Sequence, residues 1–105
     1  MNREQMLLIK LMEEMAETQQ EISKALWFGL NEQYEKHDLT NHGRVIKEIK
    51  DVINTLALLE EEGYLEGCVP NEDEYEAKVD KINKYISYSE KLGIYVPIKI
   101  GDKKF

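Results

Sequence analysis

The chain has 105 residues, of which 42% are hydrophobic and 33% are charged, so it is long enough for one folded domain with a modest core. Its formal net charge of −7 and pI of about 4.9 argue against a nucleic-acid backbone or an anionic membrane surface as its main partner. A single cysteine, the absence of a signal-peptide pattern and the lack of a long apolar run lead us to expect a soluble cytoplasmic protein.

Residues 3–29 have the apolar periodicity of an amphipathic helix. Asn2 and Gln5 predict a capping box at its start, and Gly29 predicts its end. The main apolar stripe recurs at steps of three and four residues. Its members are Leu7, Leu11, Met15, Thr18, Ile22 and Leu26.

Three acidic residues, Glu14, Glu17 and Glu21, follow one border of this stripe. At about 100° per residue they fall beside the apolar face and not opposite it. A carboxylate at the border of a packed face is partly desolvated, and it then needs a partner or a metal.

Residues 30–43 lack the helical period and are mostly polar, which indicates a connection between two helices. Thr40 or Asn41 then caps a second helix, which is expected to reach about Glu62 and to stop at Gly63. This helix also has an apolar stripe. Its members are Val45, Ile46, Ile49, Val52, Ile53, Leu56, Ala57 and Leu59.

The second helix also carries polar groups along one edge. Glu48 borders the apolar stripe, and Asp51 and Asn54 continue along the same ridge at i+3 and i+6. If the two helices pair antiparallel across their apolar faces, the two acidic edges converge into an oxygen-rich pocket that suits Mg²⁺ or Mn²⁺. The other interpretation of the spacing is a pair of solvated helix faces.

A third helix is predicted after a turn rich in glycine. Asn71 and Glu74 form its expected capping box, and Gly93 ends it. The apolar alternation in residues 94–105 is typical of a strand, but Pro97 limits it to an edge strand or an extended arm.

In their order and spacing, the acidic pairs resemble those of the MazG-like family of all-α nucleoside triphosphate pyrophosphatases. That family carries Glu-Glu-x-x-Glu on one helix and Glu-x-x-Asp on the next. Here the motifs begin at Glu13 and Glu48, as Glu13-Glu14-x-x-Glu17 and Glu48-x-x-Asp51. Residues 23–29 and 81–93 also look like the short single-domain branch of the family that is found in phages and bacteria.

This resemblance implies hydrolysis of a nucleoside triphosphate to the monophosphate and pyrophosphate, with Mg²⁺ or Mn²⁺ as cofactor. Glu17 or Glu48 would accept the proton of the attacking water. The implied metal ligands are Glu14, Glu17, Glu48 and Asp51. The expected substrate contacts are Lys24, Trp27, Asn54 and Lys84.

The fold that the resemblance implies is all-α. A helical hairpin and a third helix would form one bundle over residues 1–105, completed by dimerisation into a homodimer or homotetramer, with residues 94–105 as an extended arm. Independent support for self-association comes from a second apolar set on the first helix, because a helix with apolar residues on two sides needs two partners. That set is Ile9, Met12, Ala16 and Trp27.

Two alternatives stay open. Dimeric all-α dUTPases and phosphoribosyl-ATP pyrophosphohydrolases share the acidic pairs, so the substrate is not settled. In a non-catalytic helical interaction protein, the acids would form a solvated stripe. Stabilisation by Mg²⁺ would separate an enzyme from that last class.

Overall fold

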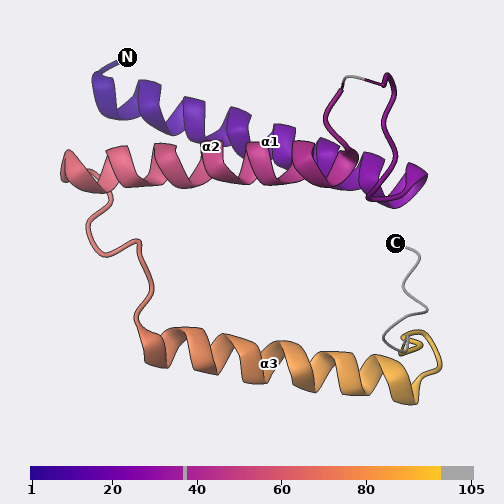
Figure 1. The fold of residues 1–105 in the computed structure, drawn as a ribbon. Coiled ribbons are helices and arrows are strands. Elements are labelled where there is room, and N and C mark those ends of the chain that lie inside the picture. The colour runs from indigo at the N-terminus through magenta and orange to yellow at the C-terminus, as the bar shows by residue number, and fades with distance from the viewer. Residues whose placement is uncertain (37, 98–105) are drawn as a thin grey trace. The chain divides into compact units, whose positions relative to one another are not determined.

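The computed structural model describes residues 1–36 and 38–97, and within them the chain is helical, with no strand. The three helices are α1 (Arg3–Phe28), α2 (Asn41–Glu61) and α3 (Glu72–Lys91) (Figure 1). The prediction of an all-α protein is therefore confirmed. No helix among the described residues combines the length and the apolar character needed to cross a membrane.

Helix α1 begins and ends where the sequence predicts. The side chain of Asn2 accepts a hydrogen bond from the Gln5 N–H, and the side chain of Gln5 accepts one from the Asn2 N–H, both at 2.9 Å. Gly29 follows the last turn with φ of +97°, and its N–H donates to the Ala25 carbonyl at 2.8 Å. This φ favours glycine over residues with a side chain, which explains the stop.

Helix α2 is capped by Thr40, whose hydroxyl accepts a hydrogen bond from the Gly43 N–H at 3.1 Å. Its last helical residue is Glu61, and Gly63 follows with φ of +81°. Both ends lie within one or two residues of the predicted ones, which is the usual uncertainty of a helix boundary.

Helices α1 and α2 form an antiparallel hairpin, as expected (Figure 1). Contacts at both ends fix this arrangement. Arg3, at the start of α1, pairs with Glu62, just after α2, with an Nε–Oε1 distance of 2.6 Å. At the other end, the Asn41 side chain donates to the Gly29 carbonyl at 2.8 Å.

The core of the hairpin is small. Within the described residues, Ala25 and Leu59 are the buried apolar residues, and Glu14 and Asn41 are the buried polar ones. Many large apolar side chains of α1 and α2 remain exposed, including Met12 at 69%. An isolated hairpin of this kind buries little apolar surface, so most of its apolar stripe is free to contact something else.

The chain divides after Cys68 into two compact units, and α3 belongs to the second. Asn71 and Glu74 form the predicted capping box of α3, and Gly93 follows it with φ of +77°. No residue of α3 is buried. The single bundle and its dimerisation remain predictions. Residues 94–97 have no strand, and the rest of the predicted arm, residues 98–105, lies outside the described part.

Candidate metal centre

Three carboxylates meet across the hairpin. Glu14 and Glu17 come from α1 and Glu48 comes from α2, and each offers an oxygen within 4.8 Å of the other two. The antiparallel pairing aligns the acidic border of one helix with that of the other, since residues three or four apart share a face. The acidic edges therefore converge, as the sequence predicts for paired helices.

The three carboxylates differ in their exposure to water. Glu14 is buried, with 9% of its side chain exposed, whereas Glu48 is half-buried and Glu17 is exposed. The Oε2 atoms of Glu14 and Glu48 are shielded from water and have no hydrogen-bond partner among the described residues. A shielded carboxylate oxygen without a partner is costly, so such atoms are expected to face a ligand.

The partner of Glu14 on the protein itself is Lys10. The Lys10 ammonium lies 3.2 Å from Glu14 Oε1 and 3.7 Å from Glu13 Oε2. Hydrogen bonding to Glu14, and attraction by its charge, raise the pKa of Lys10. Lys10 neutralises one side of the cluster and leaves Glu14 Oε2 available on the other.

The cluster has a surplus of negative charge. Desolvation raises the pKa of Glu48, and the neighbouring carboxylates of Glu17 and Asp51 raise it further, against a smaller opposing effect of Lys47. A divalent cation beside these carboxylates would favour their charged forms, because it supplies the missing positive charge. Three carboxylate oxygens are donors that Mg²⁺ and Mn²⁺ prefer, so the residues present fit such an ion.

The structure does not bring all of the predicted site residues together. Asp51 is half-buried one turn beyond Glu48 and is not a member of the three-carboxylate group. Asn54 is exposed a further turn along α2, and Lys84 is exposed on α3, in the second unit. Trp27 is 79% exposed, and its ring centroid lies 6.4 Å from that of Phe28.

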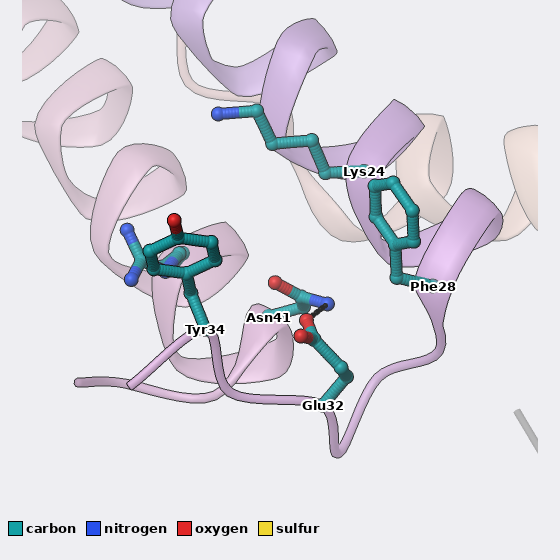
Figure 2. Close-up of a pocket in the computed structure, with 6 residues that line it drawn as sticks. Lys24, Phe28, Glu32, Tyr34 and Asn41 are labelled. Atoms are coloured by element: carbon teal, nitrogen blue, oxygen red, sulfur yellow. Dashed lines mark hydrogen bonds between the residues drawn. The ribbon is translucent and has the colours of Figure 1, made fainter. Parts of the chain in front are cut away.

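Near the loop end of the hairpin lies a pocket of about 440 Å³ that the sequence did not reveal. Lys24, a predicted substrate contact, is part of its wall, and the Lys24 ammonium pairs with Glu21 at 3.5 Å. The complete lining is Lys24, Phe28, Glu32, Tyr34, Asn41 and Arg44. Figure 2 draws the lining residues as sticks and labels all of them except Arg44.

The pocket was missed because two of its six lining residues, Glu32 and Tyr34, come from the connection between the helices, and a third, Asn41, is the first residue of α2. That connection folds back on itself through two backbone hydrogen bonds. The Asn41 N–H donates to the Glu32 carbonyl at 3.0 Å, and the His42 N–H donates to the Leu30 carbonyl at 2.8 Å. No periodic pattern encodes such contacts, although an aromatic residue within a polar segment, Tyr34, is a signal that could have been noticed.

Comparison with protein-family models, curated proteins and solved structures found no significant match to this chain. The interpretation of the site therefore depends on its geometry and on the acidic motifs.

Proposed function

We propose that this protein is a metal-dependent pyrophosphohydrolase that converts a nucleoside triphosphate to the monophosphate and pyrophosphate. The observation that carries the proposal is the pair of shielded, unpartnered oxygens on Glu14 and Glu48, beside the carboxylate of Glu17. Solvated acids would turn such atoms toward water. The acidic motifs in which these residues lie resemble those of the MazG-like pyrophosphatases, and that resemblance supplies the reaction.

The roles of the carboxylates follow from their exposure. Glu14 and Glu48, the more buried pair, would hold Mg²⁺ or Mn²⁺. Asp51, one turn along α2 and outside the three-carboxylate group, remains a predicted further ligand. The ion, when bound, supplies charge neutralisation of the phosphates and a more acidic water. Glu17 is exposed at the edge of the cluster, where it can hold a water molecule and accept its proton.

The bond changes of the reaction are those of a hydrolysis. The water oxygen forms a bond to one phosphorus of the α–β linkage, the bond from that phosphorus to the bridging oxygen breaks, and the products are the nucleoside monophosphate and pyrophosphate. The water proton passes to the carboxylate of Glu17, or to Glu48 if Glu17 serves as a ligand. No oxidant, reductant or second substrate is required.

We assign phosphate contact to Lys24, which lies two helical turns beyond Glu17 on α1. Its side chain is 47% exposed, and its ammonium, which lies 3.5 Å from Glu21 Oε1, retains further donors for a phosphate oxygen. Asn54 and Trp27 are proposed as further substrate contacts of the hairpin, and the contact of Lys84, which lies in the second unit, stays a prediction. For Trp27, an interface between copies is the competing role.

Self-association is part of the proposal. The hairpin leaves Met12, Leu26 and Trp27 at 67–79% exposure, and two of these, Met12 and Trp27, belong to the second apolar set of α1. A second copy of the chain, in a homodimer or homotetramer, would cover this surface. We place the activity in the cytoplasm, where nucleoside triphosphates are abundant.

The test is pyrophosphate release by the full chain from a panel of canonical and modified nucleoside triphosphates, with Mg²⁺ and with EDTA. We expect metal-dependent release from at least one member. The variants Glu17→Gln and Glu48→Gln should abolish it, whereas Glu13→Gln, the neighbouring exposed acid, should retain it. Folded protein that releases nothing and gains no stability from Mg²⁺ would instead indicate a helical interaction protein.

A further inference from the structure

The pocket at the loop end of the hairpin has the lining of a site for a planar, polar ligand. Phe28 and Tyr34 stand on opposite sides of Asn41 (Figure 2), and both aromatic side chains are largely exposed, Tyr34 at 84%. Its volume of about 440 Å³ lies in the range of small-molecule sites. Aromatic rings at the wall of such a pocket are suited to stacking on a flat ring.

The amide orientation of Asn41 is fixed by its hydrogen bonds. Its Nδ2 donates both hydrogens, one to the Gly29 carbonyl at 2.8 Å and one to Glu32 Oε2 at 2.9 Å. Both partners can only accept, so the nitrogen of the amide must face them. The Asn41 oxygen has no donor among the described residues and is left as an acceptor.

Glu32 provides a second acceptor beside the first. Asn41 occupies one lone pair of Oε2, and no described residue donates to Oε1. The two side chains therefore present neighbouring oxygens and no free N–H. They can bind a ligand edge that carries two adjacent N–H donors, with one of the hydrogen bonds assisted by the charge of the carboxylate.

Two cationic side chains complete the lining. Arg44 pairs with Asp38 at 3.3 Å and Lys24 pairs with Glu21 at 3.5 Å, and both retain further donors. Arginine is a usual donor to the O6 and N7 acceptors of guanine, so Arg44 is the cation assigned to the base, and Lys24 keeps its role as the phosphate contact. The lining thus offers two acceptors, cationic donors and two aromatic rings.

We propose that this pocket binds a guanine base, which makes guanosine nucleotides the substrate class if the function proposed above is correct. Guanine has two adjacent donors, the N1 hydrogen and the 2-amino group, next to the O6 acceptor. Adenine and cytosine carry one amino donor beside ring acceptors, and uracil carries one N–H between two carbonyls. Only guanine matches two neighbouring acceptors together with a cationic donor.

The pocket and the metal centre lie along the same two helices, with the pocket nearer the loop end. Lys24 lies seven residues after Glu17 on α1, a rise of about 10 Å, and Arg44 lies four residues before Glu48 on α2, a rise of about 6 Å. A nucleotide whose base occupies the pocket can therefore extend its phosphate chain toward the three carboxylates.

The experiment measures nucleoside binding by the metal-free full chain, in EDTA, by titration calorimetry or by chemical-shift changes in NMR spectra. We expect guanosine to bind, and inosine, which lacks the 2-amino group, to bind about tenfold more weakly, as expected for the loss of a hydrogen bond to a charged group. Adenosine should bind more weakly as well. Equal binding of all three, or no binding, would overturn the assignment.

Two variants sharpen the test. Glu32→Gln keeps an acceptor for Asn41 but loses the charge, so it should weaken guanosine binding by about tenfold. Glu35→Gln, in the same loop, changes an exposed carboxylate and leaves the backbone hydrogen bonds of residue 35 in place. This variant should bind guanosine as tightly as the parent protein does. An unchanged affinity in Glu32→Gln would contradict the assignment.

The two proposals fail in different ways. Guanosine binding without hydrolysis of any triphosphate would support the guanine pocket and reject the pyrophosphohydrolase. Metal-dependent hydrolysis without guanosine binding and without preference for guanosine nucleotides would reject the pocket and leave the enzyme.

Discussion

Glu14 on α1 and Glu48 on α2 face each other across the hairpin, with carboxylate oxygens within 4.8 Å of one another and of Glu17. Each also has an oxygen that is shielded from water and without a hydrogen-bond partner in the described part of the chain. Two like charges this close, and partly desolvated, destabilise the folded state. A cation bound between these carboxylates would offset their repulsion, so its addition should stabilise the fold.

Mg²⁺ or Mn²⁺ should therefore raise the melting temperature of the protein. A ligand that binds the folded state alone stabilises it by about 2.7 kcal/mol at a concentration 100 times its dissociation constant. Thermal unfolding followed by circular dichroism, with Mg²⁺ against EDTA at matched ionic strength, measures the effect. Glu14→Gln should lose it, and Glu13→Gln, whose side chain is exposed, should keep it. An equal shift in both variants would show that the ion binds elsewhere.

Replacing Glu48 by Gln should stabilise the metal-free protein. The raised pKa of Glu48 means that its charged form is unfavourable in the fold, chiefly because of desolvation and then because of Glu17. Gln has nearly the same shape and no charge, so the repulsion disappears. The melting temperature in EDTA should rise, while the response to Mg²⁺ is lost. A fall in the melting temperature would mean that the Glu48 carboxylate makes a structural contact.

The stability of the metal-free protein should depend on pH in the direction set by Glu48. Because its pKa is higher in the folded state than in the unfolded chain, the folded state binds the proton more tightly. Stability from this group is fully present below the ordinary carboxyl pKa and is lost as the pH rises through the higher, folded pKa. In unfolding measured from pH 4 to 7, the contribution of Glu48 to the free energy of unfolding should therefore decrease as the pH rises, and Glu48→Gln should remove this part of the pH dependence.

Metal binding should show the opposite pH dependence, because the ion needs the deprotonated carboxylate. The apparent affinity for Mg²⁺, measured by titration calorimetry, should fall as the pH drops through the raised pKa of Glu48. A pH-independent affinity over this range would argue that Glu48 is not a ligand.

The helices and the acidic edges could be predicted because local rules encode them. The capping box joins Asn2 and Gln5, which are only three positions apart, and the position of Glu48 beside an apolar stripe follows from helical periodicity alone. The convergence of the edges needed one further assumption, antiparallel pairing. The pocket could not be predicted in the same way, since it depends on hydrogen bonds such as that from Asn41 to Gly29, twelve residues apart in a segment without periodicity.

Replacing Asn41 by Ala tests whether that segment is held as the structure describes. Asn41 is 5% exposed, and its side chain binds both Gly29 and Glu32. Its loss should lower the free energy of unfolding by about 1–3 kcal/mol, the usual cost of leaving a buried polar partner unsatisfied. Urea unfolding measures this, with Gln33→Ala, which removes a single exposed hydrogen bond, as the milder control. Equal effects would show that Asn41 does not anchor the loop.

The exposed apolar side of α1 leads to a prediction about assembly. Trp27 is 79% exposed and Met12 is 69% exposed, although apolar side chains of this size gain roughly 1.5–3 kcal/mol when fully buried. If a second copy covers them, Trp27→Ser and Met12→Lys should each weaken the dimer, and light scattering coupled to size exclusion should detect the shift toward monomer. Lys47→Ser, at an exposed position of α2 outside the second apolar set, should leave the mass unchanged. A parent protein that is already monomeric at high concentration would refute self-association, and a partner of another kind would then have to cover this face.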